Sequence, residues 1–112
     1  EGPEEVRRCA FLCLDVAALA QQYQLPRLAR LAEAFVLRVA LPGQDSLVVP
    51  LLEQTFAAGG AVESACWEAI ERRPAQAIAA VSSHEVAQIL ARSPRFGDAL
   101  LRRVARLVPQ PA

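Results

Sequence analysis

Proline and glycine divide this chain into short segments, and their spacing limits the length of any element that it can form. Breaks are expected at Leu25-Pro26, Pro42-Gly43, Gly59-Gly60, Pro74 and Ser93-Pro94. The residue before a proline avoids the α-helical region, whereas proline itself suits the first position of a helix. A glycine pair commonly ends a helix. The chain is therefore expected to form several short elements joined by tight turns.

The composition between these breaks favours helix. The 112 residues include 22 alanines and are rich in Leu, Arg, Glu and Gln, all of which cost little in a helix. There is one Trp, one Tyr and four Phe, and β-branched residues are sparse, which argues against a β-sandwich or barrel. The fold class that we expect is all-α, with six to eight short helices stacked as antiparallel hairpins around one contiguous core.

The first two helical regions are expected at residues 3–24 and 27–40. Asp15 interrupts the first, and the pattern fits either one helix or two. Val16, Leu19, Ala20 and Tyr23 are expected to share one face. The polar stripe of residues 27–40 is narrow, so most of that helix is expected to be covered, including the apolar residues Leu28, Leu31, Phe35 and Val39.

Helical spacing continues in the second half of the chain. A helix is expected to open at Asp45 or Ser46 with Pro50 near its first turn, and another to span 61–73 with an inward stripe. A short helix should follow Pro74, and Ser82 with Glu85 forms a capping-box pattern for the next. The last helix is expected at about residues 98–108. Its inward residues would be Leu100, Leu101, Val104 and Leu107.

Charge and cysteine content narrow the cellular setting. Twelve acidic residues balance twelve basic ones, all arginine, so no overall charge favours nucleic acid or membrane partners. The longest apolar run is interrupted by Asp15 and is too short to cross a membrane. Three cysteines are too few for a disulfide framework, and the opening residues are acidic rather than signal-like. We expect a cytoplasmic or nuclear location.

Candidate catalytic and metal sites are weak. Cys9 and Cys13 share a helix face, but a zinc site needs four ligands and only Cys66 and His84 remain to complete it. Buried structural thiols and an exposed His84 are the simpler interpretation. Nucleophile-elbow, Walker, dinucleotide and zinc-protease motifs are absent from the sequence. We therefore expect no enzyme activity, no metal and no cofactor.

Two further features admit more than one interpretation. An arginine-rich C-terminal face could be a solvated helix surface or a nucleic-acid contact, although no aromatic residues interleave for base stacking. It comprises Arg95, Arg102, Arg103 and Arg106. Trp67 borders the apolar stripe of residues 61–73, where it could pack at the edge of the core or anchor a partner.

The order of segments resembles that of BTB-BACK proteins. Residues 14–36 read LDVAALAQQYQLPRLARLAEAFV and resemble the closing helices of a BTB/POZ domain, LLxLADKYxLxxLKxLCExFL. Gln21-Gln22 replace the family's Asp-Lys, and Ala32 stands where Cys is frequent. Residues 45–73, with ACWEAI at 65–70 for the family's ACxxFI, resemble a 3-box or the start of a BACK domain. Residues 74–90 are similar to the continuation of BACK.

The resemblance covers roughly residues 14–92 and implies two regions. Residues 1–42 would be the closing helices of a BTB/POZ-like domain, and residues 43–112 a 3-box/BACK-like helical domain. The strands and the dimer-forming helix of a complete BTB domain are not in this sequence, so the resemblance implies a segment of a larger protein. Its function would be non-catalytic: a substrate adaptor that binds the N-terminal region of cullin-3 in a ubiquitin ligase, with self-association possible through an upstream BTB domain.

Matching the family pattern places a partner-binding groove between two helices. The expected groove residues are Leu47, Val48, Leu51, Leu52, Phe56, Val62 and Cys66. The same seven residues could instead be core. Two other functions compete with the adaptor: a helical scaffold or oligomerisation domain of a BTB-type protein that does not bind a cullin, and a small nucleic-acid binder that uses the C-terminal arginine face.

Overall fold

The protein is all-α, as the composition predicts. A computed structural model describes residues 3–42, 44–56 and 60–107, and this part of the chain has seven α-helices, one π-helical turn and no strand. The elements are α1 (Pro3–Gln22), α2 (Pro26–Phe35), η1 (Val36–Ala40), α3 (Asp45–Thr55), α4 (Ala61–Arg72), α5 (Pro74–Ala79), α6 (Ser83–Arg92) and α7 (Pro94–Leu107).

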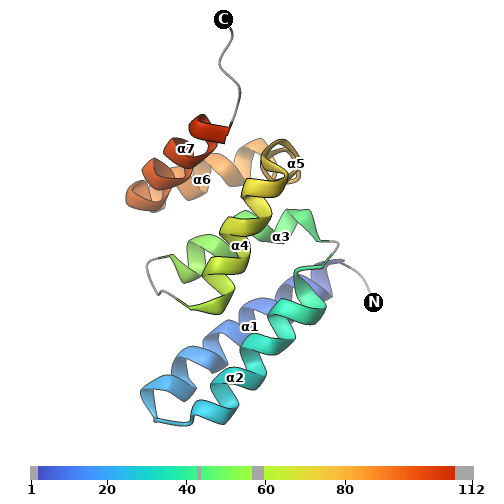
Figure 1. Ribbon diagram of the computed structural model, residues 1–112, viewed down its shortest axis with the longest axis vertical. Helices are drawn as coiled ribbons and strands as arrows, with labels where there is room; N and C mark the ends of the chain where they lie inside the picture. The colour runs from blue at the N-terminus through green and yellow to red at the C-terminus, as the bar shows by residue number, and fades with distance from the viewer. Residues whose placement is uncertain (1–2, 43, 57–59, 108–112) are drawn as a thin grey trace, which may run out of the picture.

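The molecule is elongated, with extents of 51 × 30 × 25 Å. The antiparallel hairpin of α1 and α2 lies at one end of the longest axis, and α6 and α7 lie toward the other (Figure 1). Helices α3 and α4 occupy the middle and pack against each other. The hairpin is therefore joined to the rest of the molecule along part of its length, and this leaves a large share of its surface outside the main core.

Helix α1 runs through Asp15 without a break, so the one-helix alternative is the correct one. It ends in a Schellman turn, in which the N–H of Leu25 donates to the carbonyl of Ala20 at 2.7 Å and the N–H of Gln24 donates to that of Gln21 at 3.1 Å. Gln24 has φ of 58°, in the left-handed region that normally favours glycine. Pro26 then occupies the first turn of α2.

The helix predicted at residues 27–40 is present, but its last turn is wider than an α-helix. The N–H of Leu41 donates to the carbonyl of Val36 at 2.9 Å, which is the five-residue spacing of a π-turn. The expectation that the apolar residues of this helix are covered is wrong for Leu28, Leu31 and Val39, whereas Phe35 is partly buried against the core. Only Ala29, Ala32, Val36 and Ala40 are buried, while Leu28, Leu31 and Val39 are exposed.

One hydrophobic cluster connects the two ends of the molecule. It extends from Ala10 on α1 to Leu100 on α7 and includes the fully buried Leu51, Ile70 and Ile89. Helix α3 lies at its centre, with six consecutive buried residues from 47 to 52. Pro50 is one of them, inside the helix rather than in its first turn.

The beginnings of the last two helices are set by their caps. Ser82 Oγ accepts a hydrogen bond from the backbone N–H of Glu85 at 3.1 Å, so half of the predicted capping box is confirmed. Helix α7 begins at Pro94, four residues before the predicted start, because proline is tolerated in a first turn. Leu100 is buried as expected. Leu101 is not, with 59% of its surface exposed.

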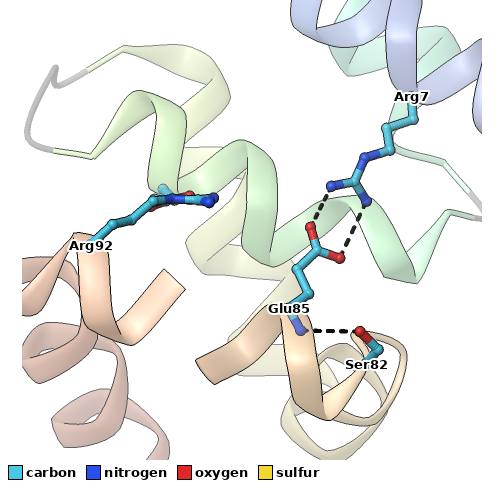
Figure 2. Close-up of polar contacts among 5 residues, drawn as sticks. Arg7, Ser82, Glu85 and Arg92 are labelled. Atoms are coloured by element: carbon cyan, nitrogen blue, oxygen red, sulfur yellow. Dashed lines mark hydrogen bonds and ion pairs between the residues drawn. The ribbon is translucent and has the colours of Figure 1, made fainter. Parts of the chain in front are cut away.

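Charged groups connect helices that are distant in sequence. The other half of the capping box is replaced, because the Glu85 carboxylate binds Arg7 of α1 instead of the Ser82 backbone (Figure 2). Glu53 on α3 accepts from the Arg92 guanidinium at 2.6 and 2.8 Å and from Ser93 Oγ at 2.6 Å. These bonds hold α1 to α6 and α3 to the turn between α6 and α7.

Candidate protein-docking surface

The seven residues predicted to line a groove lie in or against the core. Six have at most 3% of their surface exposed, and Phe56 is partly buried with its ring 5.4 Å from that of Phe96. In this conformation their side chains are packed against one another, so a partner could reach most of them only if the helices separated. The six are Leu47, Val48, Leu51, Leu52, Val62 and Cys66.

Exposed apolar side chains gather instead on the α1–α2 hairpin, whose buried residues are small. In the half of the hairpin next to its turn, the buried residues are Ala17 and Ala20 on α1 and Ala29 and Ala32 on α2. None of the four belongs to the main hydrophobic cluster. Alanine lets two helix backbones approach closely, and the two helices make the most extensive contact between any described elements. We refer to these four alanines as the alanine seam.

The large apolar residues of the same hairpin are left outside. Leu19 exposes 54% of its surface and Ala20, beside it, 2%. Tyr23 and Leu31 each expose 69%. This reverses the usual arrangement, in which leucine is buried more often than exposed. We call the exposed set the outer hairpin face; it consists of Leu12, Leu19, Tyr23, Leu28, Leu31 and Val39.

Helix geometry places these residues on one side of the hairpin. Most of them come one position before a buried residue, as in Leu19-Ala20 on α1 and Leu31-Ala32 on α2. One position is a rotation of about 100° around the helix axis. Because α1 and α2 run in opposite directions, the same backward step turns both helices toward the same side. The exposed side chains therefore form a single face.

The opposite side of the hairpin meets the rest of the molecule. Residues one position after the seam, such as Ala18 and Glu33, line a cavity together with Thr55 of α3 and Val62 of α4. Ala18 and Glu33 thus face α3 and α4, whereas the apolar residues one position before a seam alanine face away from these two helices. The outer hairpin face is consequently the side of α1 and α2 that no other described element covers.

A second candidate is a hollow bordered by η1, α3, α4 and α5. Its volume is about 350 Å³, and Val48 is the one predicted groove residue that lines it. Arg73 and Asp45 form an ion pair of 3.7 Å at its border. The hollow is small and has no buried polar side chain to orient a ligand, because the described residues include no buried polar or charged one.

The cysteines and the histidine are dispersed. Cys9 and His84 are exposed and Cys66 is buried, where burial raises the pKa of its thiol to about 12. Burial, with a smaller effect of Cys9, also raises the pKa of Cys13. Within the described part of the chain, no three His, Cys, Asp or Glu side chains gather as a metal site requires.

Trp67 and part of the C-terminal arginine face are engaged within the molecule. The indole Nε1 of Trp67 donates to Glu63 at 3.3 Å, and the Arg103 guanidinium lies 4.5 Å from the centre of its ring. Arg103 also binds Glu71 at 2.8 Å, and Arg102 binds Asp98 at 3.1 Å. The Arg103 guanidinium thus lies against the partly exposed Trp67 ring, whereas Arg95 and Arg106 form no ion pair with any residue that the structure describes.

Comparison with known proteins adds no relative: no family model, curated protein or solved structure matches this chain. No helix in the part that the structure describes has the length and apolar character needed to cross a membrane.

Proposed function

We propose that this chain is a non-catalytic protein-interaction module and that the outer hairpin face is its docking surface. The observation that carries the proposal is the pairing of a buried alanine seam with exposed Leu19, Tyr23 and Leu31. Large apolar side chains that gather on one face of a folded protein commonly mark a binding surface. The remainder of the chain, with its continuous core from α1 to α7, would hold this face at one end of an elongated body.

The more specific proposal is a BTB-BACK segment of a cullin-3 ubiquitin-ligase adaptor, acting in the cytoplasm or nucleus. It is supported by the pattern resemblance of residues 14–92 and by the all-α fold, which suits a rigid spacer between a ligase and a recognition domain. Two regions, 1–42 and 43–112, remain the expected division.

Calorimetric titration of the chain with the purified N-terminal region of cullin-3 tests this proposal. The informative variant is Leu19→Gln/Leu31→Gln, which removes apolar surface from both helices without changing charge. Leu101→Gln is the control, because Leu101 is equally exposed but lies on α7. Substitutions at such exposed positions should change the free energy of unfolding by no more than about 0.5 kcal/mol.

We expect wild type and Leu101→Gln to bind with equal affinity and the double variant to lose at least about 2 kcal/mol of binding free energy. Equal binding by all three proteins would remove the outer hairpin face from the contact. No heat from folded wild type would exclude these 112 residues as a cullin-binding segment and favour the alternative, a helical scaffold or oligomerisation domain that does not bind a cullin.

A further inference from the structure

The outer hairpin face has a basic border on one side. Arg27, Arg30 and Arg38 come one position before Leu28, Leu31 and Val39, and therefore two positions before the buried stripe of α2 and η1. A second backward step of about 100° places Arg27 and Arg38 on the edge that faces away from α1, whereas Arg30, which also follows the buried Ala29 directly, lies between this edge and the side that faces α3 and α4. All three are exposed. The remaining charged residue of this segment, Glu33, lies on the opposite side, in the cavity shared with α3 and α4.

These three arginines differ from most others in the molecule. Five arginines bind a carboxylate: Arg7, Arg73, Arg92, Arg102 and Arg103. Arg27, Arg30 and Arg38 form no ion pair with any residue that the structure describes. Their guanidinium groups retain the full set of hydrogen-bond donors that planar carboxylates satisfy.

We propose that the partner segment docking on the outer hairpin face is an amphipathic helix with acidic side chains along one flank. This inference rests on the proposed function and names the chemistry of its partner. Two antiparallel helices with neighbouring apolar stripes provide the surface on which a third helix packs. Docking there would bring the partner's flank alongside Arg27 and Arg38, and removing water from an arginine is costly unless a carboxylate pairs with it.

A second copy of this chain fits the face less well. The outward stripe of α1 and its turn consists of Leu12, Leu19, Tyr23 and the half-buried Val16, with a single exposed carboxylate, Glu5, seven residues before Leu12. Two outer hairpin faces pressed together would therefore offer apolar residues and three arginines to each other but only one acid, Glu5, which leaves most of these arginines without a carboxylate. Like charges across an interface oppose association.

The test uses the whole chain and a pair of synthetic helical peptides of about 18 residues, a length of about 27 Å. Both carry Leu at i, i+3, i+4 and i+7, and one has glutamates along a single flank that are glutamines in the other. Fluorescence anisotropy measures affinity at about 50 and about 300 mM NaCl, because exposed charge pairs weaken with salt. We expect the glutamate peptide to bind about tenfold more tightly at low salt, with a smaller ratio at high salt.

Two double variants of equal charge distinguish recognition by the arginines beside the outer hairpin face from a general electrostatic attraction between the chain and the peptide. Arg27→Gln/Arg38→Gln should reduce the ratio between the peptides to about one. Arg95→Gln/Arg106→Gln removes the same charge from exposed positions on α7 and should leave the ratio unchanged. If the two variants behave alike, the acidic flank is not recognised by α2 and the inference is wrong.

The remaining outcomes identify which proposal fails. Equal binding of both peptides would overturn the acidic chemistry while leaving the outer hairpin face as a docking surface. A wild-type chain that sediments as a dimer, dissociates on Leu31→Gln and binds neither peptide would show that a second copy covers the face. A monomer that binds neither peptide would overturn the docking face itself, and with it the proposed function.

Discussion

Leu31 exposes 69% of its surface, whereas Ala32, the next residue in the chain, exposes 8%. The same relationship occurs across the hairpin at Leu19 and Ala20. Alanine in the seam brings the backbones of α1 and α2 together, and close packing at such a seam stabilises the pair without the leucines. The leucines are then not needed for packing within the hairpin and can contact a partner. The proposed docking surface depends on this division between a small-residue seam and a large-residue face.

The turn between α1 and α2 should be improved by glycine at one position. Gln24 adopts a left-handed conformation that is unfavourable for a residue with a side chain. We expect Gln24→Gly to raise the free energy of unfolding by about 0.5–1 kcal/mol, measured by urea denaturation. Gln21→Gly is the control, because Gln21 is helical and exposed, and it should lower that free energy by up to about 1 kcal/mol. Destabilisation by Gln24→Gly would contradict the Schellman turn.

The Arg7–Glu85 pair should contribute measurably to the attachment of α1 to α6. Both side chains are partly exposed, so we expect a coupling free energy of about 0.5–1 kcal/mol in a double-mutant cycle of Arg7→Gln and Glu85→Gln. Ser82→Ala should cost about 1 kcal/mol independently, because Ser82 binds the backbone of Glu85 rather than its carboxylate. Additivity of Arg7→Gln with Glu85→Gln would show that the ion pair contributes nothing.

Helix class, element order and most breaks follow from local patterns. Pro26, Pro74 and Pro94 each begin a helix, as local patterns predict. The Ser82–Glu85 cap and the stripe of residues 62, 66 and 70 also act within a few residues, and the structure has a helix at both places. The start of α7 and the continuity of α1 also depend on local residues. Pro94 is compatible with a helix that begins at it or after it, and Asp15 is compatible with one helix or with two. Pairings such as Arg7 with Glu85 depend on tertiary packing, which no local pattern contains.

The candidate site was harder to predict, because a helical stripe does not show which of two apolar faces is buried. The sequence pattern placed Val16, Leu19, Ala20 and Tyr23 together on one face, yet the structure buries Ala20 and exposes Leu19 and Tyr23. One signal was available: a large apolar residue directly before alanine recurs at 16–17, 19–20, 28–29, 31–32 and 39–40. An alanine stripe at helical spacing on two consecutive helices is the pattern of a close hairpin.

Stability should decline in acid partly through Glu53. Hydrogen bonds from Arg92 hold the pKa of the Glu53 carboxyl below its ordinary value, outweighing the opposite effect of burial. The unfolded chain then binds a proton more readily than the folded one, so this contribution is complete above the unfolded pKa and is lost as pH falls through the folded one. Glu53→Gln should flatten the dependence of the unfolding free energy on pH below about 5, measured by urea denaturation at several pH values.

Cys9 and Cys66 should differ in reactivity. Because burial raises the pKa of Cys66 to about 12, the folded chain retains that proton while the unfolded chain releases it at lower pH. The unfolding free energy should therefore fall as pH rises above about 9. Iodoacetamide at pH 8, followed by peptide mass spectrometry, should modify the exposed Cys9 in the folded chain and Cys66 only after denaturation. Equal rates at Cys9 and Cys66 under native conditions would contradict this packing.

The central claim, that the outer hairpin face receives the partner, is tested most directly by methyl NMR of leucine and valine during titration with the glutamate peptide. We predict that the methyl signals of Leu12, Leu19 and Leu31 shift in proportion to binding. Those of the buried Leu47 and Leu51 should remain in place. Shifts confined to Leu47, Leu51 and their neighbours would contradict the claim, because they would place the contact in the core helices and not on the hairpin.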